Sequence, residues 1–396
     1  MTQSKHPTIA DAAAAADRRL EILMKKGVVI YRPQTVHIGD DVDLDRIASR
    51  AVIHPGCRIH GETTLILPGA EIGRESPATV ENCCVGPGAS LKGGFFKGAV
   101  FLKGASMGSG AHVREGTLLE EMAGGAHTVG LKQTLLLPFV TLGSLINFCD
   151  CLMAGGTSRK DHSEVGSSYI HFNFTPGGDK ATASLIGDVP RGVMLNRRPI
   201  FLGGQGGLVG PRRLAYGTVV AAGTICRKDE LREDRLIFGG GMKPGNVPST
   251  VGGGAGGKRI IKSNILYIAN LVALIRWYDH VRAMFIGEDL PEPLWMGAKD
   301  VLNAAVAERV KRLEAFVHQQ EADIAGRWSG MAASLEAARD IQGDAGRRDA
   351  FLEAVSAKIS EIGKDYIPVI QGLDASDSET GVGWLQGIVE DISKIE

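Results

Sequence analysis

Residues 85–91, VGPGASL, carry the pattern that decides the fold: an apolar residue, a glycine-containing corner, and the next apolar residue six positions later. The same spacing recurs on both sides of this stretch, in the pairs Ile38/Leu44, Ile53/Ile59 and Ile146/Leu152 and in the series Phe101, Met107, Val113. A period of six matches neither the helical repeat of about 3.6 residues nor the two-residue alternation of a simple strand.

A six-residue period is typical of a β-helix, in which each hexad supplies one short strand and one corner. The apolar residue points into the coil, and glycine accepts the positive φ that a sharp corner requires. Stacked coils bury a continuous core that no single coil buries alone. Residues 115–145 and 154–184 interrupt the hexads, so we expect loops that leave one side of the solenoid there.

Glycine and tryptophan are distributed unevenly along the chain. Only 11 of the 53 glycines lie beyond Lys262, whereas all four tryptophans do. Residues 239–257, GGGMKPGNVPSTVGGGAGG, contain little that can pack and are typical of a flexible linker. The predicted fold is therefore mainly β, with a helical C-terminal region. The predicted boundaries are an N-terminal helix at 1–27, a β-helix at 28–238, a linker at 239–261 and an all-α domain at 262–396.

Apolar residues in the C-terminal region recur with helical spacing. Val306, Val310, Leu313 and Val317 form one stripe along a helix. We expect one long helix over 293–328 and another over 347–362, with their aromatic residues in the core. We find no nucleophile, metal cluster or phosphate loop in this part of the sequence, so assembly or binding of a protein partner is its expected role.

Composition excludes several classes of protein. A net charge of −1 gives no general attraction to nucleic acid or to an anionic membrane. The most apolar window, ILYIANLVALI, is shorter than the roughly 20 residues that span a bilayer. The six cysteines fit no disulfide framework, and Cys149-Asp-Cys151 supplies only half of a tetrahedral metal site. We therefore expect a reduced, cytoplasmic protein without a secretory signal and without a bound metal.

Three motifs in order resemble a known family. RRLEILMKKGVVIYRPQTVHIGDDVDL at 18–44 is similar to the helix and entry strand of the acetyltransferase half of the bifunctional N-acetylglucosamine-1-phosphate uridylyltransferase/glucosamine-1-phosphate acetyltransferase family. HFNFTPGGDKATASLIGD at 171–188 is similar to the family's CNYDGxxKxxTxIGD, and GTVVAAGTICRKD at 217–229 to its GATIAAGTTVTRD. The resemblance covers roughly residues 15–230.

This resemblance implies a left-handed β-helix, an exception to the usual right-handed crossover, and a homotrimer with active sites between subunits. The family's uridylyltransferase domain has no counterpart in the sequence, so we expect no pyrophosphorylase activity. The helical region after the linker also lies outside the family pattern.

The family's general base is a histidine in P-H-L-S-Y-x-G, which takes a proton from the substrate amine as the amine attacks the acetyl thioester. The corresponding stretch here is LPFVTLG at 137–143, with Phe139 at the histidine position. Phenylalanine accepts no proton. His162 and His171, in SRKDHSEVGSSYIHFNF at 158–174, are the candidates for a replacement base. Each also has a structural interpretation, as a solvated loop residue for His162 and a structural hydrogen bond for His171.

The resemblance also assigns binding residues. Lys132 stands at a phosphate-binding lysine, Asn173 at the loop asparagine that holds the sugar, and Lys180 at the loop lysine. Arg159 and Lys160 are candidates for phosphate contacts or a solvated basic pair. Acetyl-coenzyme A is the implied co-substrate, in a groove formed by Ala221, Ala222, Gly223, Arg227 and Lys228.

Two hypotheses follow. The first is an acyltransferase that moves an acetyl group from acetyl-coenzyme A to an amino sugar phosphate or a nucleotide sugar. The second is a non-catalytic trimeric scaffold or sugar-nucleotide-binding protein whose helical region recruits a partner; Phe139 favours it, whereas the histidine-rich insert favours the first. A metal-dependent hydratase would need three converging histidines, such as His127, His162 and His171, whose spacing matches no known motif.

Overall fold

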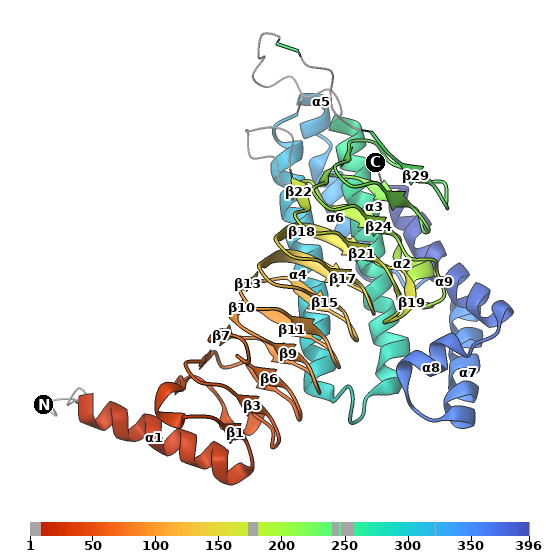
Figure 1. Cartoon of the computed structure of the whole chain (residues 1–396). Coiled ribbons are helices and arrows are strands. Elements are labelled where there is room, and N and C mark those ends of the chain that lie inside the picture. The colour runs from red at the N-terminus through yellow and green to blue at the C-terminus, as the bar shows by residue number, and fades with distance from the viewer. Residues whose placement is uncertain (1–8, 173–180, 240–244, 247–256, 321, 396) are drawn as a thin grey trace, which may run out of the picture.

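The computed structural model describes residues 9–172, 181–239, 245–246, 257–320 and 322–395. After helix α1 (Ile9–Lys26), the chain winds into a left-handed parallel β-helix, and helices of the C-terminal region run along its length (Figure 1). The predicted fold class is confirmed: a mainly β solenoid followed by an all-α region.

The β-helix is a prism with three faces. The first face has eleven strands in the order β1 (Val29–Ile30), β3 (Val52–Ile53), β6 (Glu71–Ile72), β9 (Ser90–Leu91), β12 (Ser106–Met107), β15 (Gly124–Gly125), β17 (Thr141–Leu142), β21 (Glu164–Val165), β24 (Phe201–Leu202), β27 (Val219–Val220) and β29 (Leu236–Ile237). The second face contains β2 (His37–Ile38), β4 (Arg58–His60), β7 (Ala78–Glu81), β10 (Gly94–Lys97), β13 (Ala111–Val113), β22 (Ile170–Phe172), β25 (Gly207–Val209) and β28 (Ile225–Cys226). The third face contains β5 (Leu65–Ile66), β8 (Cys84–Val85), β11 (Ala99–Phe101), β14 (Thr117–Leu119), β23 (Ser184–Ile186) and β26 (Arg213–Leu214).

Two long strands, β16 (Val129–Leu136) and β18 (Ile146–Met153), run from the second face around the corner into the third. Gln133 and Asp150 mark this corner, with φ of 52° and 57°. Because both strands pair on each side of the corner, the second and third faces form one hydrogen-bonded sheet.

Stacked apolar residues fill the interior of the prism. On the first face Ile30, Ile53, Ile72, Leu91 and Met107 are successive partners in register, and all are buried. Each such side chain contributes roughly 1.5–3 kcal/mol when it leaves water. The hexad spacing of the sequence thus becomes one continuous core.

Two stretches that we expected to be loops belong largely to the coils. Residues 115–145 contain β14, β15, β16 and β17, so the solenoid continues through them without interruption, contrary to the prediction. Within 154–184 the chain makes one antiparallel hairpin, β19 (Gly156–Ser158) and β20 (Asp161–His162), and then returns to the prism in β21 and β22.

The C-terminal region contains α3 (Gly257–Arg276), the π-turn η3 (Trp277–Val281), the 3₁₀ turn η4 (Arg282–Phe285), α4 (Glu292–Val317), α5 (Ala322–Ala325), α6 (Trp328–Ala338), α7 (Ala345–Ile362), α8 (Tyr366–Gln371) and α9 (Ala375–Ser393). The first helix begins at Gly257, before the predicted boundary at 262. The single helix predicted over 293–328 is wrong, because α4 ends at Val317. There the Gln320 amide donates to Phe316 O at 3.2 Å and satisfies a carbonyl of the last turn.

The helices pack on the third face of the prism. Helix α4 lies against β8, β11 and β14, and α3 contacts β23. A Cβ added at Gly297 would lie 2.8 Å from Cys84 Sγ, so this glycine lets α4 approach the sheet closely. Residues 257–285 are apolar and long enough to cross a membrane, but 67% of the most apolar window is buried inside the protein. Among the described residues, the main contacts of the C-terminal helices with the prism are those with strands of the third face.

Candidate functional site

Lys132 lies on the outer side of β16, in the second face. Its partner on β18 is Cys149, and on the other side lies Arg114, whose N–H donates to Leu131 O at 2.9 Å. Within the described ranges no carboxylate pairs with the Lys132 ammonium, and the Arg114 Nε lies 3.9 Å from Glu115 Oε2. Two neighbouring cations on an open face can together bind a phosphate group. Arg114 was missed in the sequence, although it lies one coil before Lys132.

His171 lies inside the prism and not on its outer surface, where a catalytic base would meet a substrate. It is in register with Phe148 and Leu208, which both point into the core. Its Nε2 lies 2.8 Å from Ser184 Oγ, and burial lowers the pKa of the ring to about 4. A neutral histidine enclosed in the core has no path to a substrate on the surface, so this position gives His171 a structural role. Asn173 and Lys180 lie outside the described residues.

The hairpin β19–β20 leaves the prism between the third and first faces and carries the other predicted base. His162 Nδ1 lies 3.0 Å from Arg159 O, and its Nε2 lies 3.9 Å from Glu164 Oε2. The ring is therefore oriented through one nitrogen, while the other remains partly exposed beside a carboxylate, as a general base requires. The side chain of His162 is 22% exposed.

The two basic residues of the hairpin differ in their contacts. Arg159 Nη1 donates to Met122 O at 2.6 Å, so this guanidinium fastens the hairpin to an earlier corner of the prism. Lys160 is exposed, and among the residues the structure describes its ammonium has no ionic partner. At the base of the hairpin, the Gln371 amide of α8 donates to Thr157 O at 2.7 Å. Lys160 is thus the one of the pair left available to a ligand.

Phe139, at the position of the family's histidine, is buried with a φ of 72°. Its N–H donates to Glu121 O at 3.0 Å, so it forms part of a corner of the prism. The structure therefore offers no proton acceptor at the side chain of this position.

Residues 221–223 form the corner between β27 and β28. A Cβ added at Gly203, one coil earlier, would lie 2.4 Å from Ala222 N, so the two corners stack through a glycine. A Cβ added at Gly223 would meet nothing within 4 Å, which leaves open space beside the backbone. Lys228 is exposed one coil corner further on, and Arg227 is half-buried. This arrangement leaves a shallow, small-residue surface over which an extended ligand can lie.

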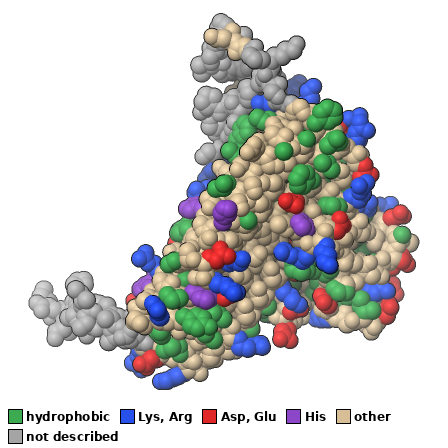
Figure 2. All heavy atoms as spheres, in the orientation of Figure 1, with side chains coloured by type: hydrophobic (Ala, Val, Ile, Leu, Met, Phe, Trp, Pro, Cys, Tyr) green, Lys and Arg blue, Asp and Glu red, His purple; other side chains and the backbone are tan. Residues whose placement is uncertain are grey.

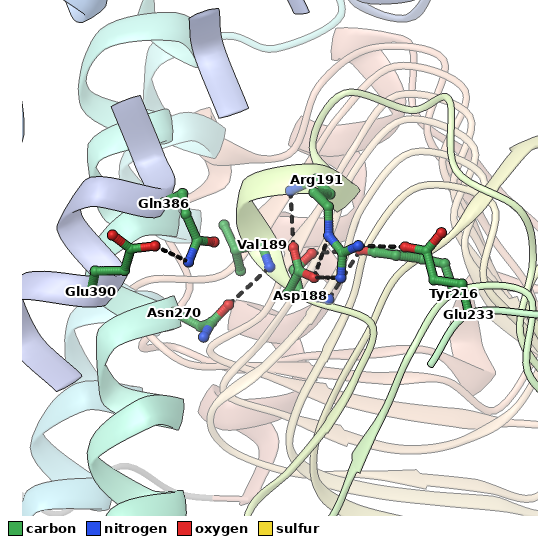
Figure 3. A network of polar contacts seen from close by, with 8 residues as sticks. All are labelled: Asp188, Val189, Arg191, Tyr216, Glu233, Asn270, Gln386 and Glu390. Atoms are coloured by element: carbon green, nitrogen blue, oxygen red, sulfur yellow. Dashed lines mark hydrogen bonds and ion pairs between the residues drawn. The ribbon is translucent and has the colours of Figure 1, made fainter. Parts of the chain in front are cut away.

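A cavity of about 300 Å³ lies between the last coils and helices α3 and α9. Figure 3 shows its polar wall, in which Asp188 caps α2 (Val189–Gly192) by accepting from Arg191 N at 3.0 Å. Asn270 Oδ1 of α3 accepts from Val189 N at 2.9 Å. Tyr216 accepts from Asp188 N at 3.0 Å. This cavity could not be predicted from the sequence, because its walls come from segments far apart in the chain.

The predicted site residues do not all lie on one face of the prism. Lys132 lies on the second face, the corner at 221–223 joins the first and second faces, and His162 lies between the third and first. A site that used them all would have to combine surfaces of two subunits. No group of three or more histidine, cysteine or acidic residues within the described residues is arranged to hold a metal ion.

No protein-family model matches the chain. Curated relatives are named bifunctional protein GlmU. The protein from Kineococcus radiotolerans is 32% identical over 222 residues, which are 56% of this chain and 40% of that protein. Those from Nitratidesulfovibrio vulgaris and Thermotoga petrophila are 29% and 26% identical, and the matches cover 51% and 54% of this chain. The chain thus spans about two fifths of the length of the relatives it matches.

These matches confirm the resemblance that the sequence motifs indicated, and the share of the relatives that is matched agrees with one of their two halves. Among solved structures, the UDP-N-acetylglucosamine acyltransferase from Campylobacter jejuni is 18% identical. That match covers 54% of this chain and 70% of the other, with a TM-score of 0.20.

Proposed function

We propose that this chain is a hexapeptide-repeat acyltransferase that moves an acetyl group from acetyl-coenzyme A to an amino sugar phosphate or a nucleotide sugar. The observation that carries the proposal is the relationship to bifunctional protein GlmU over about half of the chain. The open corner at 221–223 and the unpaired Lys132 on the second face support it, because the reaction needs a surface for the thioester carrier and a cation for the acceptor phosphate.

His162 is the base that we propose. Its partly exposed Nε2 takes a proton from the acceptor amine while the amine nitrogen attacks the thioester carbonyl. The carbon–sulfur bond then breaks, and coenzyme A leaves as a thiol once its sulfur is protonated.

We further propose that the active site lies between subunits of a homotrimer. Outward residues Phe201, Val219 and Leu236 are in register on the last coils of the first face, and each is more than a third exposed. Figure 2 shows hydrophobic side chains gathered at the upper end of the molecule, where these coils lie. Since the helices cover the third face, only the first two faces remain for contacts between subunits. Such contacts can bring His162 of one subunit toward Lys132 of the next.

The second candidate is a non-catalytic sugar-nucleotide-binding scaffold. Two observations favour it: Phe139 fills the base position, and His171 is enclosed in the core. In this case Lys132 binds the ligand together with Asn173 and Lys180, to which the family resemblance assigns this role, and no transfer follows.

The discriminating experiment is a thiol-release assay with acetyl-coenzyme A and glucosamine 1-phosphate. The acyltransferase proposal predicts turnover that falls by about 10²–10⁴-fold in His162→Gln, which is the usual contribution of a general base. His54→Gln, a histidine paired with Glu71 at the far end of the prism, is the matched control and should keep full activity. Absence of turnover combined with binding of the sugar nucleotide would favour the scaffold.

A further inference from the structure

A second, larger groove adjoins the cavity of Figure 3, with a volume of about 570 Å³. Arg213, Leu266, Gln386 and Val389 line both hollows. Its walls are the end of β26, the first turns of α3 and the last turns of α9. A groove of this size fits a small molecule.

Basic side chains dominate this groove. Arg213, Arg259 and Lys262 line it, and none of them forms an ion pair with any residue of the described ranges. A fourth cation, Lys394, is neutralised by Asp391 at 2.8 Å. Two carboxylates, those of Asp229 and Glu390, also line the groove and keep their negative charge; Asp229 Oδ1 accepts from the backbone N–H of Arg213 at 3.3 Å. Glu390 accepts from the Gln386 amide at 3.1 Å.

Arg212, next in the chain, adds positive charge at the edge of the groove. Arg212 Nη1 and Arg259 Nη1 both donate to Pro211 O, at 2.6 and 3.2 Å. Burial and then the charge of Arg259 lower the pKa of Arg212. Arg212 Nε is buried and has no hydrogen-bond partner among the described residues. Two guanidinium groups that share one carbonyl repel each other; the Asp229 carboxylate opposes this effect on Arg212, and a bound anion would oppose it further.

The start of α3 increases the positive potential. Its first turns carry Lys258, Arg259 and Lys262 and no acidic residue. A helix N-terminus has a partial positive charge and favours acidic side chains, so this distribution of charge disfavours the helix as it stands. A bound anion would reverse that effect.

We propose that this groove binds a small molecule through a doubly charged phosphate or diphosphate group, with Arg213, Arg259 and Lys262 as its direct contacts. Arg212, Arg213, Arg259, Lys262 and Lys394 are five cations against the three carboxylates of Asp229, Glu390 and Asp391, and this excess of two matches the charge of a phosphate monoester, which is close to −2 at pH 7. Arginine and lysine side chains donate several charge-assisted hydrogen bonds to phosphate oxygens. The inference does not depend on acyl transfer, because it concerns binding at the junction of the β-helix and the helices.

The test is isothermal titration of the full chain with inorganic pyrophosphate at low ionic strength. Arg259→Gln/Lys262→Gln should weaken binding by at least about tenfold, since the variant loses two charge-assisted contacts to the anion. Arg58→Gln/Arg74→Gln removes the same charge at the other end of the prism and should leave binding unchanged. Arg259→Lys/Lys262→Arg keeps the charge and should retain binding, which separates loss of contact from loss of fold.

Absence of pyrophosphate binding by the unaltered protein would overturn the proposal, as would equal binding by the glutamine variant and the unaltered protein. Competition identifies the source of the phosphate. Displacement of pyrophosphate by coenzyme A, but not by pantetheine, assigns the groove to the carrier; displacement by glucosamine 1-phosphate assigns it to the acceptor. If the protein showed no acyl transfer but still bound pyrophosphate through these residues, the proposed function would be contradicted and the proposed phosphate groove would stand.

Discussion

Arg282 and Glu121 form an ion pair inside the protein although 161 residues separate them in the chain. Glu121 lies at a corner of the β-helix, and Arg282 lies in the turn η4 between α3 and α4. The Arg282 guanidinium is fully buried and stacks on Tyr366 at 3.8 Å from the ring centroid. This pair therefore joins the helical region to the solenoid.

Removal of one partner should be much more harmful than removal of both. Arg282→Met leaves Glu121 buried without a counter-charge and should lower the free energy of unfolding by about 3–5 kcal/mol. Arg282→Met/Glu121→Leu should recover most of that loss, because Arg282 Nε and Glu121 Oε2 are already buried without partners among the described residues. Urea denaturation of the two single variants and the double variant measures the coupling. If the loss in the double variant equalled the sum of the losses in the two single variants, Arg282 and Glu121 would not be coupled as a buried pair.

The neighbouring Glu120 makes the same junction sensitive to pH. Its carboxyl accepts from Tyr278 Oη at 2.6 Å, and burial raises its pKa to about 7. Because the folded pKa lies above the unfolded value of 4.5, stability is retained below pH 4.5 and lost as the pH rises toward 7. Glu120→Gln cannot ionise, so at pH 8 it should be more stable than the unaltered protein by up to about 3 kcal/mol.

The measurement for Glu120 is urea denaturation at several pH values between 4.5 and 8. Glu62→Gln changes an exposed carboxyl of the β-helix and serves as control, with no gain expected at pH 8. If Glu120→Gln and the unaltered protein had the same free energy of unfolding at pH 8, the charged Glu120 carboxylate would carry no burial cost, which would contradict the prediction.

His171 should act in the opposite direction. Its pKa is about 4 in the folded protein, below the ordinary 6.5, so its contribution is present above pH 6.5 and is lost as the pH falls toward 4. The loss amounts to about 3 kcal/mol. In the unaltered protein this slope and that of Glu120 oppose each other between pH 4.5 and 6.5. In His171→Gln the free energy of unfolding should therefore increase as the pH falls from 6.5 to 4.5. The same change at the exposed His112, His112→Gln, should not have this effect.

The β-helix could be predicted from the sequence because apolar residues recur every six positions in several stretches between residues 38 and 152. The stretch 115–145 escaped the pattern because its coils use small and polar residues at inward positions. Thr134 and Thr117, for example, are fully buried within strands β16 and β14. A search for apolar residues every six positions misses a coil built with threonine.

The site could be predicted only in part. Residues that are two positions apart on a strand point to the same face of the sheet. Whether that face is the inner or the outer one depends on the register of the strand, and the length of the hairpin before β22 does not reveal this register in the sequence. His171 is consequently inside rather than outside. The proposed phosphate-binding groove is lined by both Arg213 and Gln386, which lie far apart in the sequence. Only the tertiary packing brings these two residues together.

The second face should bind the acceptor phosphate through Lys132 and Arg114. Lys132→Gln and Arg114→Gln should each raise the KM for glucosamine 1-phosphate by about tenfold or more, the effect of one lost charge-assisted hydrogen bond. The kcat should change little, because a contact made equally in the ground state and the transition state affects binding alone. Arg58→Gln, on β4 of the same face but several coils away, is the control. An unchanged KM in both variants would place the acceptor phosphate elsewhere, and a lower kcat without a change in KM would assign Lys132 to the chemical step instead.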